Sequence, residues 1–584
     1  MILIFGGTTE GRIAAEVCEQ AGRTYYYSTK GSMQTINLCH GTRLTGVMTA
    51  EDMHKFCADH HIRCIINAAH PFASALHATI ATTSLPVIRW QRKESKPYLS
   101  PLVQYCTDYE DAMVRMQKDS IHHLLALSGA NTIERLRPYW THHRTTFRIL
   151  HRKESQEKAL LHGLPEERII YYNDTSLLPT IEQEQQVMID SLCDAIITKD
   201  SGDNGGLDSK VRAAIGLGIR VYIIQRPTLP EHWHYVDGKH TLRLAIQQLV
   251  PEFYDLHTGL TTGACATAAA KAALMSLLYG DCPDRVSFAL PNGETITIPV
   301  KAEGIGKASV IKGNNDDPDV TKGCCITVSV CPNETGEVRF VQGKGVGTVT
   351  LPGLGIPVGE PAVNPTPRMM ITKEIRDISQ DGYDVCISVA GGETLAAHTF
   401  NHKVGVKGGI SIIGTSGIVS PLSHEAFIQS IQRELEVAHA IGCNSIGLAS
   451  GKKGEEAILA QHPVMRIVHY GNFIGETLGM AHQLGFKSVV LGIMIGKAVK
   501  LAQGHLDTHS HKVSIDRDFL AGIAHDIGMD KTTINRIQTI TMARQLWEFM
   551  PTTFFDTITQ LCYTHCRKVY PQGQLQILLL CDNN

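Results

Sequence analysis

The chain has 584 residues, of which 43% are hydrophobic and 19% are charged, and its formal net charge is −3. This length predicts roughly two to four domains, and the near-neutral charge excludes a general basic field for nucleic acid. No apolar run reaches the roughly 18 residues of a membrane span. The 16 cysteines lack paired spacing, so we expect a cytoplasmic protein with reduced thiols and no metal site of its own.

The chain begins with an apolar strand, residues 2–5, which runs into a glycine-rich turn and a helical segment. A strand, a glycine turn and a hydroxyl cap before a helix place backbone N–H groups where they bind a phosphate. A tight strand–helix turn without a ligand is an equal alternative, because the full GxGxxG pattern is missing. The candidate cofactor contacts are Gly6, Gly7, Thr8, Thr9, Glu10 and Gly11.

The second predicted strand, residues 23–31, ends in hydroxyl and basic side chains. Ser28 and Thr29 stand where an NAD site often has an acidic residue that binds the ribose. Hydroxyl and basic groups suit a 2′-phosphate better. We therefore expect Ser28 and Thr29 to contact the cofactor and NADPH to be favoured over NADH.

A third strand, beginning at Cys64, ends in a turn that contains His70 and Pro71. Ligands bind at this carboxyl edge in open α/β sheets, which makes His70 a candidate catalytic residue, although turn histidines are commonly structural. The segment that follows carries Arg89 and Arg92 around Trp90. These arginines form either a patch that clamps substrate carboxylates or a solvated charged loop.

Residues 194–227 contain the clearest motif of this half. A strand ends in Lys199, a glycine-rich turn follows, and a helix from about Leu207 carries Lys210. Strands that alternate with helices predict parallel sheets, and hence an α/β fold. Lys199 is a candidate catalytic residue and Lys210 a candidate substrate contact. The candidate cofactor contacts of the turn are Ser201, Gly202, Gly205 and Gly206.

Residues 1–250 resemble the precorrin-6A reductase family. The resemblance rests on GGTTEGR, the AHPFA turn, the TKDSG turn with its later glycines, and the closing Arg226-Pro227. It implies two Rossmann-like lobes and reduction of a corrin-ring precursor with NADPH or NADH. It places His70 and Lys199 in the cleft as proton donors or carboxylate clamps. One departure is Asn67, where the resemblance leads us to expect Asp.

Residues 251–256 form a short linker, in which Pro251 interrupts any continuous helix. A helix is predicted for the run from Ala264 to Leu278, with hydroxyls at Thr261 and Thr262 before it and Gly280 after it. Thr261 and Thr262 are candidate substrate contacts. A second domain therefore begins near His257 and extends to residue 584.

The second half is first β-rich and then alternates strands with helices, which predicts an α+β fold. A hairpin is expected about Asn292-Gly293. Asp316, Asp317 and Asp319 crowd one turn between two strands, either as ligand contacts or as an acidic surface turn.

One turn and three single residues in the second half are further candidates for ligand binding. Arg368 follows a stiff Gly- and Pro-rich loop and suits a carboxylate. Thr415, Ser416 and Gly417 form a turn whose hydroxyls and N–H groups suit an anion or a cofactor. Asn472 stands at a strand end. His509 lies in an H-x3-H-x-H run, residues 505–511, that suits a substrate contact or a plain loop better than zinc.

Residues 257–584 resemble the cobalt-precorrin-5B carbon-1 methyltransferase family. The resemblance rests on TTGACATAAAKAA, DDPDVT, the segment from Gly343 to Arg368, GGISIIGTSGIVSPLS, YGNFIG and THSHK. It implies transfer of a methyl group from S-adenosylmethionine to a ring carbon, for which alignment and exclusion of water suffice. The cobalt arrives with the substrate.

The two resemblances describe consecutive steps, methylation to cobalt-precorrin-6A and its reduction to cobalt-precorrin-6B. A bifunctional enzyme of cobalamin biosynthesis is therefore expected, with a tetrapyrrole as its small-molecule partner and a homo-oligomer as one possible state. The alternatives are a tetrapyrrole carrier without catalysis, a methyltransferase with an inactive reductase half, and a general nicotinamide oxidoreductase with an unrelated second domain.

Overall fold

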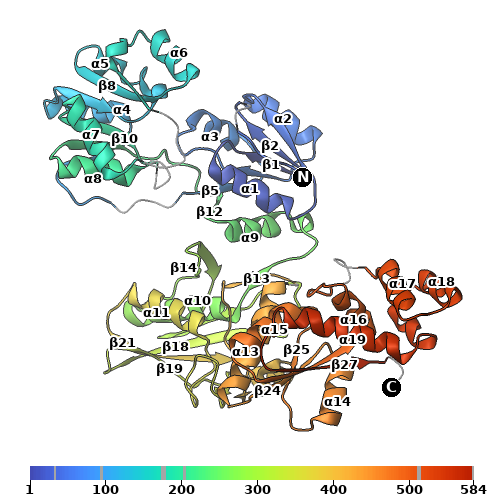
Figure 1. Cartoon of the computed structure of the whole chain (residues 1–584). Helices are drawn as coiled ribbons and strands as arrows, with labels where there is room; N and C mark the ends of the chain where they lie inside the picture. Colours follow the sequence, from blue (N-terminus) through green and yellow to red (C-terminus); the bar gives the residue numbers. More distant parts are fainter. Residues whose placement is uncertain are drawn as a thin grey trace. The chain divides into compact units, whose positions relative to one another are not determined.

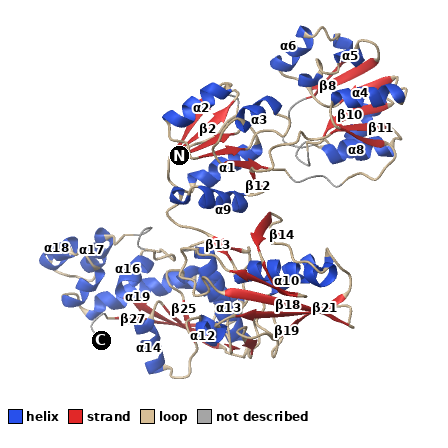
Figure 2. Ribbon diagram, turned by 180° about the vertical axis from the view of Figure 1, so that it is seen from behind, coloured by secondary structure: helices blue, strands red, loops and turns tan. Residues whose placement is uncertain are grey.

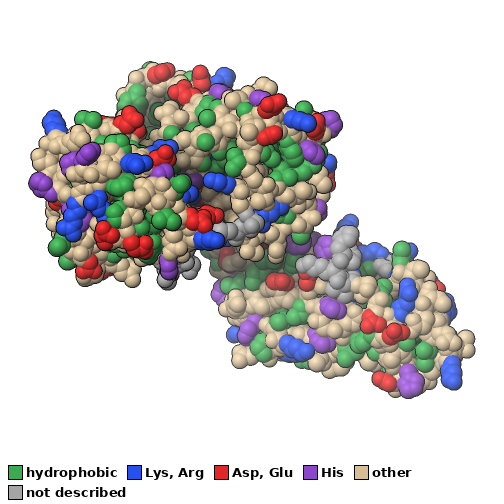
Figure 3. Space-filling view, turned by 90° about the horizontal axis from the view of Figure 1, so that it is seen from above, with side chains coloured by type: hydrophobic (Ala, Val, Ile, Leu, Met, Phe, Trp, Pro, Cys, Tyr) green, Lys and Arg blue, Asp and Glu red, His purple; other side chains and the backbone are tan. Residues whose placement is uncertain are grey.

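The computed structural model describes residues 1–31, 34–92, 97–172, 179–201, 206–421, 423–509 and 514–581. The chain folds into two compact units, Met1–Asp255 and Leu256–Asn584 (Figure 1). None of the helices formed by these described residues is long and apolar enough to cross a membrane. Acidic, basic and hydrophobic side chains are interspersed on the face shown in Figure 3, as the near-neutral charge suggests.

The first unit contains two six-stranded sheets in which every strand pairing is parallel. The first sheet has the order β12 (His234–Val236), β5 (Val87–Trp90), β4 (Cys64–Asn67), β1 (Ile2–Phe5), β2 (Tyr25–Thr29) and β3 (Gly41–Thr45). The second has the order β6 (Val103–Cys106), β11 (Arg220–Ile224), β10 (Ala195–Lys199), β7 (His123–Ala126), β8 (Arg144–Leu150) and β9 (Ile169–Tyr172). The prediction of two Rossmann-like lobes is confirmed.

Strand β1 is buried along its whole length because helices cover both faces of its sheet. Ile2 and Ile4 pack with α1 (Thr9–Glu19) and α9 (Lys239–Leu249). Leu3 and Phe5 pack with α2 (Ala50–Asp59) and α3 (Ser74–Ala81) on the other face. The continuous apolar run ILIF is therefore explained by a sheet without a solvent-facing side.

The first lobe is discontinuous in sequence. Its strand β12 and helix α9 follow the whole second lobe along the chain, and β12 pairs with β5 through Tyr235 opposite Arg89. The chain therefore leaves the first sheet after β5, builds the second lobe, and returns to the edge of the first sheet (Figure 2).

Each sheet of this unit has a point where the order of its strands reverses. It lies between β1 and β4 in the first sheet and between β7 and β10 in the second. Ligands of open α/β sheets bind outside the carboxyl ends of the strands at such points. The turns after β1 and β4 and the turn after β10 are therefore placed for binding.

The second unit begins with the predicted alanine-rich helix, α10 (Thr262–Tyr279). The Thr261 hydroxyl accepts from Ala264 N at its start, and Gly280 ends it in the left-handed conformation with φ +76°. The predicted hairpin is also present as β14 (Arg285–Ala289) and β15 (Thr295–Pro299). Both features depend on short-range turn and capping chemistry, and both predictions are confirmed.

Helix α10 packs on a mixed five-stranded sheet and on α11 (Pro365–Arg376). The strand order is β16 (Lys301–Gly304), β17 (Lys307–Ile311), β18 (Cys325–Asn333), β21 (Gly382–Val389) and β19 (Val338–Val341). All neighbours are antiparallel except β19 and β21. This part is α+β, as predicted.

The rest of the second unit is built on a four-stranded parallel sheet. Its order is β25 (Ile467–His469), β24 (Ser445–Ala449), β26 (Ser488–Met494) and β27 (Gln574–Leu580). The helices that flank it include α13 (His424–Ala440), α14 (Lys452–Gln461), α15 (Ile474–Gln483), α16 (Ile495–Ala502) and α19 (Thr552–Arg567). The strand order reverses between β24 and β26, which makes their carboxyl ends another candidate ligand edge.

Candidate functional site

The turn after β1 is tied directly to the turn after β4. The Thr8 hydroxyl donates to the carbonyl of Ala68 at 2.7 Å and accepts from Gly11 N at 3.0 Å. Gly6 packs so closely on Tyr27 that a Cβ there would lie 2.3 Å from the Tyr27 ring. Gly7, with φ +89°, has open space where a Cβ would point. Gly6 is therefore required for packing, while Gly7 leaves room for a ligand.

Glu10 and Arg92, two predicted ligand contacts, bind each other. Arg92 Nε lies 2.8 Å from Glu10 Oε1 and its Nη2 lies 2.9 Å from Oε2. Burial alone would raise the pKa of Glu10, but the hydrogen bonds from Arg92 hold it below its usual value. Arg92 also donates to the carbonyl of Ser201 at 3.3 Å. The pair therefore connects the first lobe to the turn after β10 in the second.

Lys199, at the end of β10, extends toward the turn after β4. Its Nζ lies 5.4 Å from the centre of the Phe72 ring. Burial, with a smaller contribution from Arg135, lowers the pKa of Lys199 to about 8. No hydrogen bond or ion pair to another described residue engages this ammonium group. Lys199 is therefore a half-buried acid of moderate strength, as a proton donor near neutral pH requires.

His70 lies beside the same cationic groups. Burial, followed by the charges of Arg92 and Lys199, lowers the pKa of His70 to about 4. Its Nδ1 accepts from Phe72 N at 3.2 Å, so the proton of the neutral ring resides on Nε2. A neutral imidazole is a poor acid but a good hydrogen-bond donor. The geometry thus separates the two predicted roles, with Lys199 the better proton donor.

A basic residue that the sequence analysis missed, Arg43, lies beside the end of β2. Ser28 and Thr29 are buried, and the Thr29 hydroxyl donates to the carbonyl of Gly31 at 2.9 Å. Arg43, on the neighbouring β3, donates from Nη2 to the same carbonyl at 3.3 Å. Its buried Nε has no hydrogen-bond partner. An arginine beside the end of the second strand suits a 2′-phosphate. The sequence gives no indication of this position, because one arginine in a short strand does not show which neighbouring strand it lies beside.

Arg89, a predicted carboxylate clamp, is engaged by the chain itself. It is 3% exposed, and its Nη1 donates to Asn67 Oδ1 at 2.8 Å and to the carbonyl of Ala69 at 2.9 Å. Burial lowers the pKa of Arg89 to about 10. Arg89 thus holds the turn that carries His70, and Asn67 supplies a neutral oxygen where an acidic partner was expected.

Replacing Asn67 with Asp is expected to raise the pKa of His77, which burial and Arg89 lower to about 4. Asn67 Nδ2 lies 3.1 Å from His77 Nδ1, while His77 Nε2 faces the carbonyls of His70 and Pro71. The ring is therefore protonated at Nε2 and accepts at Nδ1. A carboxylate cannot donate there and instead favours a second ring proton. Nitrogen-15 NMR titration should place this pKa above about 5.

The titration has an internal reference and a clear contrary result. His123, on β7 of the second lobe, has a pKa that burial lowers, and this pKa should be the same in both proteins. A His77 that still titrates near pH 4 in the Asn67→Asp variant would contradict the assigned tautomer.

The remaining predicted residues of this unit lie in or near the turn after β10. Gly202 and Gly205 lie outside the described residues. Gly206 caps α8 (Leu207–Gly216) with φ +63°. Lys210 lies in the first turn of α8, where burial and then Arg148 lower its pKa to about 8 against the effect of Glu184. The charged neighbours of Lys210 are thus Arg148 and Glu184, and not the groups around His70.

In the second unit, Thr261 and Thr262 join the start of α10 to the turn that contains Thr415. Thr261 N donates to the carbonyl of Gly417 at 3.0 Å, and the Thr262 hydroxyl accepts from Ile413 N at 2.9 Å. Ser416 Oγ binds both backbone groups of Ile418. These groups hold the turn in place, while the Thr415 hydroxyl donates to Gln429 Oε1 at 3.3 Å.

The acidic turn binds the chain's own groups. Asp316 Oδ2 accepts from His257 N at 2.7 Å and lies 2.8 Å from His257 Nδ1. Asp319 pairs with Lys312, which is 1% exposed. Asp317 N donates to the Asn315 side chain at 3.0 Å. Arg368, the predicted carboxylate partner, lies 2.7 Å from Glu360 and is thus already paired.

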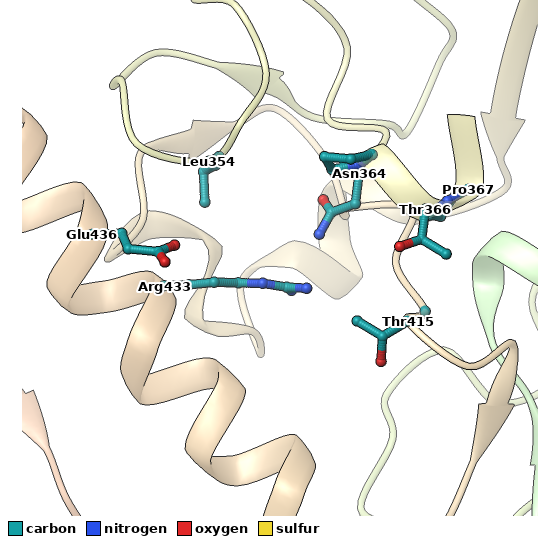
Figure 4. A pocket seen from close by; sticks show the side chains of 9 residues that line it. Leu354, Asn364, Thr366, Pro367, Thr415, Arg433 and Glu436 are labelled. Carbon is teal, nitrogen blue, oxygen red and sulfur yellow. The ribbon is translucent and has the colours of Figure 1, made fainter. Parts of the chain in front are cut away.

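A cavity of about 200 Å³ lies between the start of α11, the turn at Thr415 and the middle of α13. Arg433 projects into it from α13, toward Asn364, Thr366 and Thr415 (Figure 4). Glu436 and Leu354 line the opposite side. The sequence analysis did not single out Arg433, because one arginine on an amphipathic helix is usually exposed to solvent.

A basic cluster lies at the carboxyl edge of the parallel sheet in this unit. Lys497 and Lys500, one turn apart on α16, donate to the carbonyls of Gly471 and Thr508. Burial, followed by the charge of Lys500, lowers the pKa of Lys497 to about 8. Among the described residues, neither lysine has a carboxylate within ion-pair distance. The two lysines therefore mark a place for an anionic ligand.

Two predicted contacts lie beside these lysines. The Asn472 carbonyl accepts from Thr508 N at 3.0 Å. The His509 ring lies 5.8 Å from the ring of His424, at the start of α13. His511, from the same run of histidines, lies outside the described residues, and those that are described contain no group of three His, Cys, Asp or Glu suited to a metal ion.

Comparison with known proteins identifies the families of both units. The cobalt-precorrin-5B C(1)-methyltransferase of Prosthecochloris aestuarii (strain DSM 271 / SK 413) is 39% identical over 346 residues, covering 56% of this chain and 94% of the relative. The chain belongs to the cobalt-precorrin-5B C(1)-methyltransferase family. The methyltransferase of Methylococcus capsulatus (strain ATCC 33009 / NCIMB 11132 / Bath) is also 39% identical, covering 56% of this chain and 90% of its own.

The family profiles extend this assignment to both halves of the chain. Residues 251–421 match CbiD and residues 507–584 match the CbiD C-terminal domain. Residues 1–247 match precorrin-6x reductase CbiJ/CobK. This member of the methyltransferase family thus also carries a reductase domain, and both families are families of enzymes.

Two solved structures resemble parts of the chain. The cobalamin biosynthesis protein (CbiD) from Archaeoglobus fulgidus is 28% identical, with a TM-score of 0.26, and covers 47% of this chain and 85% of its own. A CobK precorrin-6A reductase is 18% identical, with a TM-score of 0.35, and covers 43% of this chain and 97% of its own.

Proposed function

We propose that this chain catalyses two consecutive steps of cobalamin biosynthesis. The second unit methylates cobalt-precorrin-5B at carbon 1, and the first unit reduces the resulting cobalt-precorrin-6A to cobalt-precorrin-6B. The observation that carries the proposal is the union of the two families in one chain, residues 1–247 with a reductase and residues 251–421 and 507–584 with a methyltransferase. Joining consecutive enzymes raises the effective concentration of a scarce intermediate.

The reductase half is proposed to bind NADPH at the carboxyl edge of its first sheet. The open space at Gly7 and the start of α1 suit the phosphates, while Arg43 and the absence of an acidic side chain at Ser28 and Thr29 favour a 2′-phosphate. The Glu10 carboxylate would oppose a phosphate, but Arg92 neutralises it. When bound, the nicotinamide supplies the hydride.

Lys199 is proposed to supply the proton that accompanies this hydride. Its position at the end of β10, its burial and its pKa of about 8 fit a donor that is mostly protonated at neutral pH. His70, neutral and protonated at Nε2, orients a carbonyl or carboxylate of the substrate by donating a hydrogen bond. The substrate thereby gains one hydride and one proton, which is a net gain of two hydrogens.

The methyltransferase half is proposed to bind S-adenosylmethionine at the reversal point between β24 and β26. Gly451, after β24, has open space around its Cα, and a Cβ at Gly454 would lie 3.2 Å from Ala449 Cβ, so α14 packs directly on the sheet. These are the features of a strand–turn–helix ligand site. When bound, the sulfonium supplies the methyl group, its carbon–sulfur bond breaks, and a bond forms to carbon 1 of the ring. The chain contributes alignment and exclusion of water.

An anaerobic incubation with cobalt-precorrin-5B, S-adenosylmethionine and NADPH or NADH tests the proposal. Mass spectrometry should detect a product that has gained one methyl group and two hydrogens, with a larger rate for NADPH. Methyl gain alone would mean that the reductase half is inactive. No mass change, together with no binding of either cofactor by calorimetry, would reject the enzyme and leave a tetrapyrrole carrier.

A further inference from the structure

Arg433, on α13, is a partly buried arginine of the second unit. With the Asn364 amide turned to satisfy its neighbours, the oxygen of Asn364 accepts from both Nη1 and Nη2 of Arg433 at 3.2 Å. No described acidic residue lies within ion-pair distance of the guanidinium. Arg368, in the same region, has Glu360 as its partner. Burial lowers the pKa of Arg433 and the charge of Glu436 raises it, so the guanidinium is a partly buried cation without an ion-pair partner among the described residues.

The charge of Glu436 raises the pKa of Arg433 against the effect of burial, but Glu436 does not lie within ion-pair distance of the guanidinium. It lines the same cavity, one turn further along α13, but Gln432 Nε2 donates to its Oε1 at 2.8 Å. In Figure 4 the guanidinium of Arg433 extends past Glu436 toward Asn364 and Thr366. The charged end of Arg433 therefore faces the cavity and its hydroxyl groups, and not an internal partner.

The size and the lining of the cavity indicate what it holds. A volume of about 200 Å³ corresponds to roughly seven water molecules at about 30 Å³ each, which accommodates a short side chain and not a macrocycle. The planar guanidinium matches a carboxylate with two parallel hydrogen bonds. The Thr366 hydroxyl adds a further donor, whereas the Thr415 hydroxyl already donates to Gln429 and lines the wall of the cavity. A carboxylate on a short alkyl arm satisfies both Arg433 and Thr366.

We infer that Arg433 and Thr366 bind a carboxylate arm of the tetrapyrrole substrate in this cavity. This inference rests on the proposed methyltransferase function and names the part of the substrate that the cavity takes. The start of α13, at His424, lies beside His509 and the basic cluster of Lys497 and Lys500. Arg433 lies nine positions further along the same helix, a rise of about 14 Å, so the cavity and the basic cluster are separate places in the second unit.

The carboxylate has one other source, the amino-acid part of S-adenosylmethionine. Calorimetry distinguishes the two sources by measuring how tightly three probes bind to the whole chain. The probes are cobyrinic acid, a stable cobalt corrinoid with free carboxylates, cobinamide, in which these groups are amides, and S-adenosylhomocysteine. Because none of these is turned over, the result does not depend on whether the wild-type chain catalyses methylation.

Arg433→Met is expected to weaken the binding of cobyrinic acid by about tenfold or more, because a hydrogen-bonded charge is lost. Cobinamide and S-adenosylhomocysteine should bind as before. Arg433→Lys, which keeps the charge without the two-pronged geometry, should give an intermediate loss and covers the case in which the methionine variant fails to fold. Arg544→Met removes an exposed charge from the same unit and is the matched control.

Two results would overturn the inference. One is an affinity for cobyrinic acid that stays within about twofold of wild type in folded Arg433→Met. The other is a loss of affinity for S-adenosylhomocysteine alone, which would mean that the cavity binds the methyl donor and not the tetrapyrrole. A wild-type chain that binds cobyrinic acid but fails to methylate cobalt-precorrin-5B would reject the proposed function and leave the carboxylate site intact.

Discussion

Replacing Lys199 with Met is expected to lower the turnover number of the reductase half by about 10²- to 10⁴-fold, the usual contribution of a positioned acid. Lys199 is half-buried at the carboxyl end of β10, and within the described part of the chain no acidic group pairs with it. Methionine keeps its length and removes the proton. Conversion of cobalt-precorrin-6A under saturating NADPH measures the rate.

The pH profile distinguishes a proton donor from a carboxylate clamp. A donor must be protonated, so the wild-type rate should fall as the pH rises through about 8, and the residual rate of Lys199→Met should lack this fall. Lys199→Arg keeps the positive charge but holds its proton throughout this range. It should therefore bind substrate normally and react slowly. An active Lys199→Arg, with a raised KM as the sole defect of Lys199→Met, would assign Lys199 to substrate binding.

Replacing Asp319 with Asn is expected to lower the free energy of unfolding of the second unit by about 3–5 kcal/mol. Lys312, the partner of Asp319, is 1% exposed and would keep a buried charge with no counter-ion. The hydrogen bond from Thr321 N to Asp319 Oδ1, 2.8 Å long, can persist with an amide oxygen. Urea unfolding followed by circular dichroism measures the loss.

Companion variants separate charge from packing. Lys312→Met combined with Asp319→Asn removes both charges and should recover most of the loss. Asp316→Asn, at a side chain that is 43% exposed, should cost much less stability than Asp319→Asn, because solvent screens an exposed ion pair. If Asp319→Asn unfolds as the wild type does and instead abolishes ligand binding, the carboxylate serves the ligand, as the acidic turn first suggested.

The interactions that sequence analysis predicted well are those made within a few residues of the chain. Thr261 caps α10 through Ala264, three residues on, and Gly280 ends the same helix. The Asn292-Gly293 turn closes a hairpin between adjacent strands. Such features depend on local backbone geometry. The parallel sheets followed from the alternation of strands and helices, which is also a local pattern.

The sequence did not predict which partners the individual candidate residues have in the folded chain. Glu10 and Arg92 were each expected to contact a ligand, and they bind each other across 82 residues. Arg89 was expected to clamp a substrate, and it holds Asn67. A charged side chain has the same appearance in a sequence whether its partner is a ligand or another side chain, because only packing decides which one lies within reach.

The sequence by itself determined the two α/β and α+β halves, the families that they resemble, and the turns at the strand ends that are candidates for ligand binding. The tertiary structure alone decided that β12 returns to the first lobe, that Arg43 and Lys497 lie near the carboxyl edges of their sheets, and that Arg433 faces a cavity with no described carboxylate within ion-pair distance of it. The physical reason is distance along the chain. Local patterns in the sequence determine where helices and strands begin and end. Whether a charged side chain has an ion-pair partner depends on residues that only folding brings together.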